Sequence, residues 1–507
     1  MSKKKVAIIG AGPGGLTAGM LLSAKGYDVE IYEKNDTIGG RTSRLKQGEF
    51  QFDLGATFFM MPQLLEELFE EAGRDLHDYV QLQRLDPLYT LRFGDVTFTP
   101  RVDRQDMMEE IERVFPGESD GFNRFMEKEG EKFDRVEKLL RRPFIHKRTY
   151  LSKDVLHAIP KLDMFQTVYS KLSTYFNDER LKYAFTFQAK YLGMSPWKCP
   201  GTFTILSYLE HKFGLYHPIG GVNRICEAMR QVIEEYGGIV HTGTPVAQIV
   251  TEGKRAAGLK LEDGREVRAD EVIINADYSY SMQHLFQDKW KKKFQKKLEN
   301  KKYSCSTFML YLGLKQEVEL PHHMVVFADD YKKNVEEMTE QFVLSEDPSV
   351  YIHYPTKLDP TTAPAGKSTV YLLMPVPNTQ ADIDWEKESP HMRQKMLEIL
   401  ARETGIDNVQ ELIETEHCIT PPDWEAMNIQ HGAVFNLAHS LDQMMYNRPH
   451  NQIKELSHCY LVGGGTHPGS GLPTIFQSAK ISADLVEKNN RAASGQPLKA
   501  SREKVSM

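Results

Sequence analysis

The chain has 507 residues, too long for one ordinary core, and is expected to form two or three domains. Hydrophobic residues make up 40% and charged residues 26%, and the mean hydropathy of -0.47 excludes a protein with many membrane spans. The net charge of -7 gives no general attraction to nucleic acid, and five scattered cysteines without a CxxC pair predict no zinc site or disulfide framework.

A short basic stretch, Met1–Lys5, precedes the apolar run Val6–Ile9. A signal peptide needs a longer apolar core before its cleavage site. The run therefore predicts a buried first strand, and the protein is expected to be cytoplasmic.

The chain opens with a pattern of strand, tight turn, helix and strand. The strand pattern covers Val6–Ile9, the helical pattern Leu16–Lys25, and the second strand Asp28–Glu33. Gly26 stands where a glycine commonly ends a helix. This order predicts a βαβ unit.

The middle of the chain changes character at Gly220-Gly221. Before it, residues 62–214 show apolar residues at three- and four-residue spacing among many charges, which predicts mostly helix. After it, we expect a helix at 224–236 and a small meander of strands at 247–275.

The last third is predicted to mix strands and helices. Alternating runs at 306–314 and 369–374 predict strands, and 386–416 reads as helix. Tyr460–Val462 predicts one more strand before a glycine loop and a final helix. The polar residues 490–507 are expected to form a disordered tail.

The segment Gly10-Ala-Gly12-Pro-Gly-Gly15 matches the GxGxxG fingerprint of a dinucleotide site. Gly10 permits the tight turn, Gly12 lets a pyrophosphate approach the backbone, and Gly15 lets the helix pack on the strand. Glu33 closes the second strand about 20 residues on, where a carboxylate accepts ribose hydroxyls and disfavours the 2′-phosphate of NADP. Because these features are in register, we predict a dinucleotide site.

Two further segments distinguish FAD from NAD. Gly39-Gly40-Arg41 and Phe52-Asp53-Leu-Gly55 resemble the extended fingerprint of the FAD-containing amine oxidase superfamily. In that superfamily the second diglycine and its Arg lie along the pyrophosphate. The resemblance therefore implies FAD.

The loop Gly463–Pro473 follows a strand and opens the final helix. A helix start directs positive potential at a ligand, which suits the flavin edge that gains negative charge on reduction. We assign His467 to loop structure or to the flavin edge, because nothing nearby in sequence would tune its pKa as a base.

The neighbouring His322 and His323 are the one pair that could suggest a metal. No carboxylate or further His lies at ligand spacing from them in the sequence. We therefore expect no metal site.

Nearly the whole chain, from residue 5 to about 489, resembles the bacterial FAD-dependent carotenoid desaturases that act on phytoene or diapophytoene. Besides the fingerprint, the resemblance rests on Val168-Tyr-Ser-Lys-Leu172, Gly220-Gly221-Val, Val350-Tyr-Ile-His-Tyr-Pro355, Leu373-Met-Pro-Val-Pro377 and Thr466-His-Pro-Gly469-x-Gly471. It implies an enzyme that desaturates a long apolar polyene by hydride transfer to FAD.

The resemblance also implies the residues that hold FAD. They are Gly10, Gly12, Gly15, Glu33, Lys34, Gly40, Arg41, Gly55, Ala56, Val246, Gly464, Gly471 and Leu472.

An acidic and a basic residue on one helix have been suggested to assist catalysis in this family. The acidic position falls on Asp154, and the basic position falls on His157, which departs from the family pattern. These two are the candidate catalytic residues. The alternative is a helix N-terminal charge at Asp154 and a surface residue at His157.

The resemblance implies an α/β fold with a Rossmann-like FAD-binding domain that is discontinuous in sequence. Residues 1–85, 215–285 and 450–489 are assigned to this domain. Residues 86–214 and 286–449 are assigned to an α+β substrate domain with a helical, membrane-facing part.

The family further implies an enzyme on the inner face of the cell membrane that passes electrons to oxygen or a quinone. Two basic amphipathic segments are candidates for membrane contact. Lys289–Leu298 places Trp290 and Phe294 on one helical face, and Arg141–Arg148 precedes an amphipathic stretch from Leu156 to Phe165. Packing of the apolar face on the core is the alternative for each.

Three other functions share some of these features. A carotenoid terminal-methyl oxygenase or ketolase shares the cofactor motifs, and the desaturase is favoured because Tyr303–Phe308 and Val350–Pro355 look more like that branch. A soluble flavin amine oxidase would need an aromatic cage, which the sequence does not identify. A non-catalytic flavin protein would not need the intact loop Gly463–Pro473. The sequence does not indicate the carbon number of the substrate, the number of desaturation steps or the oligomeric state.

Overall fold

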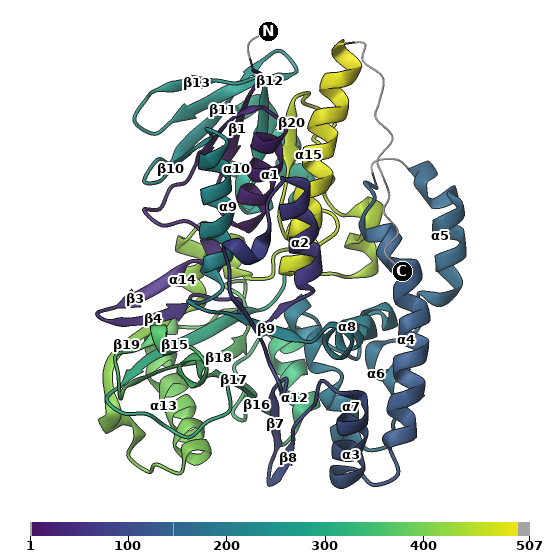
Figure 1. The fold of residues 1–507 in the computed structure, drawn as a ribbon, viewed down its shortest axis with the longest axis vertical. Coiled ribbons are helices and arrows are strands. Elements are labelled where there is room, and N and C mark those ends of the chain that lie inside the picture. The colour runs from purple at the N-terminus through teal and green to yellow at the C-terminus, as the bar shows by residue number, and fades with distance from the viewer. Residues whose placement is uncertain (1–2, 145–146, 495–507) are drawn as a thin grey trace.

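Two sheets organise the chain, one in the upper and one in the lower part of Figure 1. The computed structural model describes residues 3–144 and 147–494. Each sheet takes strands from distant parts of the sequence, so neither body is continuous along the chain.

The upper sheet has five parallel strands in the order β10-β2-β1-β14-β20. Their bounds are β1 Lys5–Ile9, β2 Asp28–Tyr32, β10 Ile239–His241, β14 Glu271–Ile274 and β20 Cys459–Leu461. Successive side chains of a strand point to opposite faces. In β1, Val6 and Ile8 accordingly pack with one core cluster, whereas Ala7 and Ile9 pack with another.

Helices cover one face of the upper sheet and a strand meander covers the other. The helices are α1 Pro13–Ala24, α2 Pro62–Glu71, α9 Asn223–Glu235 and α15 Leu472–Ser494 (Figure 1). The meander is β11 Val246–Glu252, β12 Arg255–Leu261 and β13 Glu266–Arg268. The expected order of strand, turn, helix and strand is present, and Gly26 follows α1 with φ +84°.

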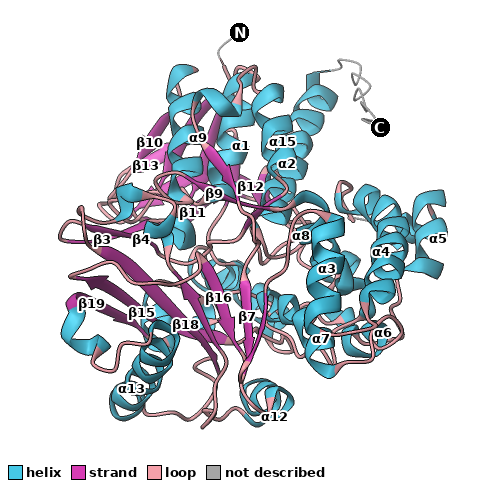
Figure 2. Ribbon diagram, turned by 60° about the horizontal axis from the view of Figure 1, so that its bottom comes forward, coloured by secondary structure: helices cyan, strands magenta, loops and turns pink. Residues whose placement is uncertain are grey.

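The lower sheet has seven strands in the order β19-β15-β18-β17-β16-β7-β8, and β15, β18, β16 and β7 can be followed in Figure 2. Their bounds are β7 Thr90–Phe93, β8 Val96–Phe98, β15 Ser306–Leu314, β16 His323–Val326, β17 Val350–His353, β18 Ser368–Val376 and β19 Ile413–Ile419. The long helix α13, Trp385–Thr404, packs on one face. The other face packs on β4, Phe50–Asp53, which pairs with β3, Arg44–Gln47.

A group of helices lies beside the lower sheet (Figure 2). It comprises α3 Arg104–Val114, α4 Ser119–Leu140, α5 Lys153–Ala158, α6 Val168–Leu172, α7 Glu179–Ala184 and α8 Ile205–Phe213. A small sheet of β5 Phe59–Met60, β9 Leu215–Pro218 and β6 Leu82–Arg84 joins the two bodies. The remaining helices are α10 Tyr278–His284, α11 Asp288–Leu298, α12 Tyr331–Glu336 and α14 Pro421–Ala426.

The stretch 62–214 is mostly helix, as expected, and also contains the short strands β6, β7 and β8. Two other sequence expectations about elements are wrong in part. The predicted helix at 386–416 ends at Thr404, and β19 begins at Ile413; β19 is an edge strand with polar, half-buried side chains, so it lacks a strong apolar pattern. The tail begins later than expected, because α15 continues to Ser494, and residues 495–507 lie outside the described residues.

No helix within residues 3–144 and 147–494 is both long enough and apolar enough to cross a bilayer. The two large sheets, the smaller sheets and the helices together confirm the expected mixed α/β class.

Candidate functional site

A cavity of about 1180 Å³ extends from the turn between β1 and α1 to helices α4 and α8. This exceeds the ~300–1,000 Å³ of sites that take one small ligand. The cavity therefore has room for a dinucleotide and part of a second molecule.

The glycine turn forms one end of this cavity. Gly10 has φ +94°, a left-handed conformation that favours glycine. Gly12 precedes α1 and has no side chain that could cap the first N–H groups of this helix, so these groups stay available to a ligand. The start of α1, with its positive potential, borders the cavity. This arrangement suits a pyrophosphate.

Gly15 is the one predicted cofactor residue that does not border the cavity. A Cβ at this position would lie 2.2 Å from the Gly10 carbonyl oxygen and 2.8 Å from Nδ2 of Asn275. Asn275 itself donates from Nδ2 to that carbonyl at 3.1 Å. Gly15 thus allows the turn to close, as the packing argument from the sequence expected, but the structure shows no place for direct contact with the dinucleotide.

Glu33 follows β2 and is buried. Its Oε2 accepts a hydrogen bond from the Ala11 N–H at 2.8 Å, and its Oε1 accepts one from the Asn35 N–H at 3.0 Å. A carboxylate has about four acceptor positions, so Glu33 can hold the glycine turn and still accept ribose hydroxyls. The adjacent Lys34 is exposed and donates to the Met427 carbonyl at 2.8 Å.

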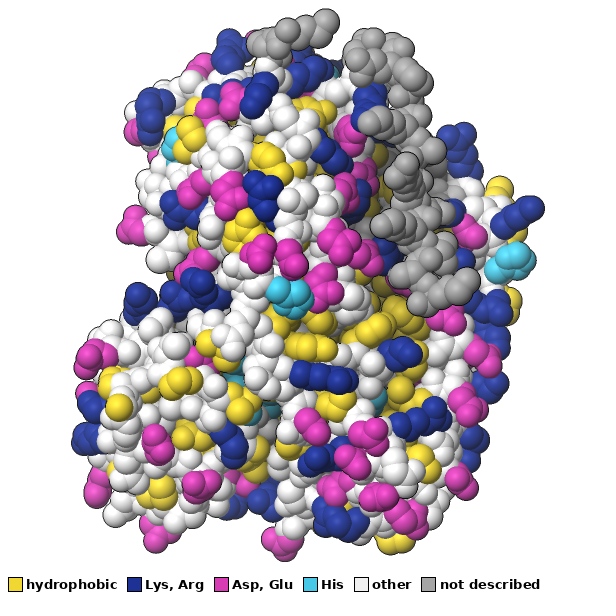
Figure 3. Space-filling view, viewed as in Figure 1, with side chains coloured by type: hydrophobic (Ala, Val, Ile, Leu, Met, Phe, Trp, Pro, Cys, Tyr) yellow, Lys and Arg dark blue, Asp and Glu magenta, His cyan; other side chains and the backbone are white. Residues whose placement is uncertain are grey.

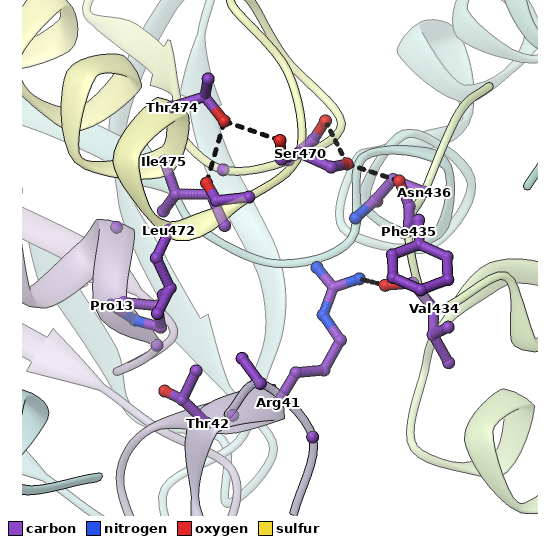
Figure 4. A pocket seen from close by; sticks show the side chains of 18 of the residues that line it. Pro13, Arg41, Thr42, Val434, Phe435, Asn436, Ser470, Leu472, Thr474 and Ile475 are labelled. Atoms are coloured by element: carbon purple, nitrogen blue, oxygen red, sulfur yellow. Dashed lines mark hydrogen bonds between the residues drawn. The ribbon is translucent and has the colours of Figure 1, made fainter. Parts of the chain in front are cut away.

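Arg41 reaches across the cavity from the second diglycine toward Val434 and Asn436 (Figure 4). Its guanidinium donates to the Val434 carbonyl, and the Asn436 amide links it to Asp277, accepting from Arg41 at 2.8 Å and donating to Asp277 at 2.7 Å. Burial lowers the pKa of Arg41 and raises that of Asp277, and the attraction between their charges opposes both shifts. Gly40 lines the cavity beside Arg41.

The other predicted cofactor positions also border the cavity. Gly55 and Ala56 follow β4, and the Tyr371 hydroxyl donates to the Gly55 carbonyl at 2.9 Å. Val246 begins β11 and lines the cavity with Glu262.

The loop between β20 and α15 forms the far wall. Gly464, Gly471 and Leu472 line it, and α15 begins at Leu472, so its first N–H groups face the cavity. In Figure 4, Leu472, Thr474 and Ile475 approach from this side, opposite Arg41.

A family model described as flavin containing amine oxidoreductase matches residues 13–486. The chain belongs to this family. A 4,4'-diapophytoene desaturase (4,4'-diapolycopene-forming) of Methylomonas sp is 45% identical to it over 490 residues, 96% of each chain. A zeta-carotene-forming phytoene desaturase of Myxococcus xanthus is 38% identical over 94% of this chain and 93% of that relative.

Among solved structures, a cyclohexylamine oxidase from Brevibacterium oxydans matches with a TM-score of 0.60, 16% identity, and coverage of 97% of this chain and 100% of the other. This likeness shows the fold alone. The match of this chain to the flavin containing amine oxidoreductase family confirms the expected cofactor, FAD, and the expected enzyme class. The glycine turn, Arg41 and the start of α15 are residues that fit FAD.

Arg448 is a supporting residue of the flavin oxidoreductase that the sequence analysis missed. It is fully buried and donates to the carbonyls of Thr466 at 3.1 Å, Leu437 at 3.3 Å and Gly464. Burial lowers its pKa to about 9. Arg448 therefore holds the loop between β20 and α15, and no local motif marks it, because its partners are backbone groups.

His467 supports the same loop from the other side. Its Nε2 donates to the Arg142 carbonyl at 2.9 Å, and burial lowers its pKa to about 4, so the ring is neutral near pH 7. It does not border the cavity. This placement agrees with a role in loop structure and gives it no contact with a substrate.

Beyond the dinucleotide end, the cavity becomes an apolar chamber between the two bodies. On the face shown in Figure 3, hydrophobic side chains gather at the same level, between the upper and lower parts of the molecule. The chamber is lined by Met60, Leu64, Phe133, Val136, Leu140, Phe187, Phe203, Leu206, Leu209, Val325, Phe327 and Leu373. At its α4 end, Glu137 and Arg141 also border it and pair with each other at 2.8 Å.

Asp154 and His157 both lie on α5, at the outer edge of the helical group (Figure 1). Asp154 pairs with Arg142 at 2.5 Å, and His157 is exposed. Neither borders the cavity. The geometry thus gives no support to acid–base assistance by this pair, which stays an untested prediction.

The expectation of no metal at His322 and His323 rested on spacing in the sequence alone, and it stays a prediction. The fold brings His217 and His353 to these residues, and ligand atoms of His217, His322 and His353 lie within 4.8 Å of one another. They come from three distant segments, so no spacing in the sequence could show them.

The apolar face of α11 is covered, not exposed. Trp290 and Phe294 are buried in the core cluster beneath the upper sheet, so the apolar face of this helix packs on the core, which was the alternative for this segment. The second candidate differs: Leu156 is 51% exposed and Phe165 is 97% exposed. Residues 145–146 of that basic segment lie outside the described residues.

Proposed function

We propose that this flavin oxidoreductase desaturates a long apolar polyene, such as diapophytoene or phytoene, in carotenoid biosynthesis. The observation that carries the proposal is the continuity of one cavity from the loops that suit FAD to a chamber lined by apolar side chains. The two relatives named above are desaturases of such polyenes, which supports the same substrate class.

FAD supplies the acceptor for the hydride that leaves the polyene. The residues of the chain would bind and orient FAD: the starts of α1 and α15, which border the same cavity, would hold its two ends. Arg41 ties the second diglycine to Val434. The chamber excludes water and offers apolar contact along the polyene, whose conjugation stabilises the charge that develops. Within this proposal, residues 1–85, 215–285 and 450–489 form a Rossmann-like FAD-binding domain, and 86–214 and 286–449 form the substrate domain.

The proposal includes contact with the inner face of the cell membrane through α5 and the residues on either side of it. The exposed apolar residues Leu151, Leu156 and Phe165 lie among basic residues that include Arg148 and Lys153. Such a surface partitions into the boundary between headgroups and acyl chains. Because α5 packs on α4, which lines the chamber, a polyene would have a short route from the bilayer. The proposal also assigns reoxidation of the flavin to oxygen or a quinone.

The test uses the purified FAD-loaded protein and vesicles that contain diapophytoene or phytoene. Under anaerobic conditions, the proposal expects bleaching of the oxidised flavin together with polyene absorption at longer wavelength. Products that gain oxygen only when air is admitted would favour the terminal-methyl oxygenase. A flavin bleached by benzylamine, with both polyenes unchanged, would overturn the desaturase assignment in favour of an amine oxidase.

A further inference from the structure

Four histidines from distant parts of the chain meet behind the wall of the cavity. His217 lies in β9, His322 and His323 at the start of β16, and His353 at the end of β17. All four are at most 8% exposed, and none of them borders the cavity itself. Neighbouring ring centroids are 4.9 Å apart for His217 and His322, for His322 and His353, and for His323 and His353.

The nitrogen atoms of these rings are almost all without partners. Among the described residues, Nδ1 of His217, Nε2 of His323, and both ring nitrogens of His322 and His353 have no hydrogen-bond partner. Buried polar atoms are normally satisfied, because leaving one unpaired costs ~1–3 kcal/mol. Six unpaired nitrogens at one place therefore indicate a further component at the site, an ion or water, that pairs with them.

Asp359 orients the first of these rings. Its Oδ2 is 3.0 Å from His217 Nε2 and also accepts the Gly220 N–H at 2.6 Å, so the carboxylate is fixed by the backbone. With Nε2 protonated toward Asp359, the Nδ1 lone pair of His217 is free on the side of the other histidines. A carboxylate that holds the far nitrogen of a ring in this way is typical of histidines that bind a metal.

The charges nearby also suit a cation. Asp359 is fully buried beside His217. Asp53 is also buried, and it lies close enough to both His217 and Asp359 to interact with them electrostatically. Two buried carboxylates can balance a divalent ion.

We propose that His217, His322 and His353 bind a divalent transition-metal ion of the zinc type, with Asp359 orienting His217. Zn²⁺ prefers imidazole ligands at about 2.0–2.1 Å in a tetrahedral arrangement, in which ligand atoms are about 3.4 Å apart. The three ligand atoms are within 4.8 Å of one another, so side-chain rotations that move these atoms by about an ångström complete the arrangement. His323 or water takes the fourth position.

The ion would fasten the small joining sheet to the lower sheet. His217 belongs to β9, which pairs with β5 and β6. His322 directly precedes β16, and His353 ends the neighbouring strand β17. Next to the site, His323 Nδ1 contacts the Tyr351 hydroxyl at 2.7 Å, and that hydroxyl contacts Thr57 at the cavity wall. The ion thus stabilises the wall of the chamber without touching the substrate.

The experiment measures metal content in FAD-loaded protein purified without a histidine tag. After loading with Zn²⁺ and dialysis against metal-free buffer, we expect about one Zn²⁺ per chain by elemental mass spectrometry. X-ray absorption should show imidazole ligands, with at most one oxygen neighbour from water and no sulfur. Added Zn²⁺ should also raise the unfolding temperature, because an ion that binds only the folded state stabilises it.

Matched variants decide whether the ion lies at this cluster. His322→Gln and His353→Gln should lower the Zn²⁺ affinity at least tenfold, and Asp359→Asn about 10- to 100-fold. The control is His211→Gln, a buried histidine of α8 outside the cluster, which should keep the metal. Flavin content and circular dichroism identify any variant that fails to fold. If the variants fail to fold, the X-ray absorption spectrum of Zn²⁺-loaded wild-type protein decides whether imidazoles bind the ion.

Two results would overturn the proposal. One is wild-type protein with full FAD that holds less than about a tenth of an equivalent of Zn²⁺ after loading, which would mean a cluster of histidines and water only. The other is Zn²⁺ that remains at full stoichiometry in both glutamine variants, because the ion would then be bound elsewhere. Neither result depends on the substrate of the enzyme.

Discussion

At the scale of single residues, the glycines of the first turn have two different roles. Some leave room for the cofactor, and one leaves room for neighbouring atoms of the chain. Gly10 and Gly12 border the cavity, whereas Gly15 only leaves space for the Gly10 carbonyl. Gly15→Ala should therefore push the turn open, with an overpacking cost of about 1–3 kcal/mol, and much of the bound FAD should be lost. The control is Gly26→Ala, which has φ +84° but no atom within 4 Å of the added methyl.

Flavin absorbance of the purified variants and thermal unfolding measure this difference. Gly26→Ala should lose about 1 kcal/mol through backbone strain and keep its FAD. If Gly15→Ala bound FAD as tightly as Gly26→Ala, the clearance argument would be wrong.

A second residue-scale prediction concerns the buried pair of Arg41 and Asp277. Arg41→Gln leaves the Asp277 carboxylate without its compensating charge, which costs about 3–5 kcal/mol for a buried pair. The double variant Arg41→Gln/Asp277→Asn should recover most of that stability in urea unfolding, but it should not recover FAD affinity, because the guanidinium is still missing. Recovery of both quantities would show that Arg41 serves only Asp277.

The residues that could be predicted from the sequence are those that belong to a local motif. Gly10, Gly12 and Glu33 follow from the spacing of a single βαβ unit, and they border the cavity. Arg448 and His217 could not be predicted, because their partners lie in segments far away along the chain, and only the folded chain brings them together.

At the scale of elements, two amphipathic segments with similar patterns have opposite fates. The apolar face of α11 packs into the core around Phe286, whereas Leu156 on α5 and the later Phe165 remain exposed. The helical period predicts an apolar face in both cases. It cannot indicate whether another element covers that face, because coverage depends on the tertiary arrangement.

The exposed segment carries the third prediction. Leu156→Glu/Phe165→Ser should lower binding to vesicles of phosphatidylglycerol and phosphatidylethanolamine by at least tenfold, since each large apolar side chain contributes about 1.5–3 kcal/mol when buried. The control is Ile239→Glu on β10, which is 49% exposed on the upper body and should not affect binding. Cosedimentation with the vesicles gives both values, and equal loss in the two variants would contradict the assignment of the surface.

At the scale of the whole molecule, the cavity lies where discontinuous segments meet. The order of the segments could be predicted from changes in character along the chain, such as the one at Gly220-Gly221. The way in which β7 joins the lower sheet could not, because it pairs in parallel with β16 more than two hundred residues away. Long-range pairing of this kind leaves no local pattern in the sequence.

The free energy of unfolding should depend on pH through one buried acid near the chamber. Glu210 of α8 is fully buried and accepts hydrogen bonds from the Tyr89 hydroxyl at 2.9 Å and from Gln188 at 2.7 Å. Burial raises its pKa to about 7, against which the two hydrogen bonds act only in part. In the unfolded chain the group ionises near its usual value of 4.5, so between these values the folded state holds a proton that the unfolded state has released.

The stability that Glu210 contributes is therefore present below pH 4.5 and is lost as the pH rises to about 7. Relative to Glu210→Gln, the wild-type protein should lose on the order of 3 kcal/mol of unfolding free energy across this range, and above it the variant should be the more stable. Urea unfolding at a series of pH values measures the difference between the two curves. The exposed Glu49→Gln serves as control and should run parallel to the wild type, because an exposed carboxylate is solvated in both states. A Glu210→Gln curve that also ran parallel would show that the buried carboxyl ionises in the folded protein as easily as in water.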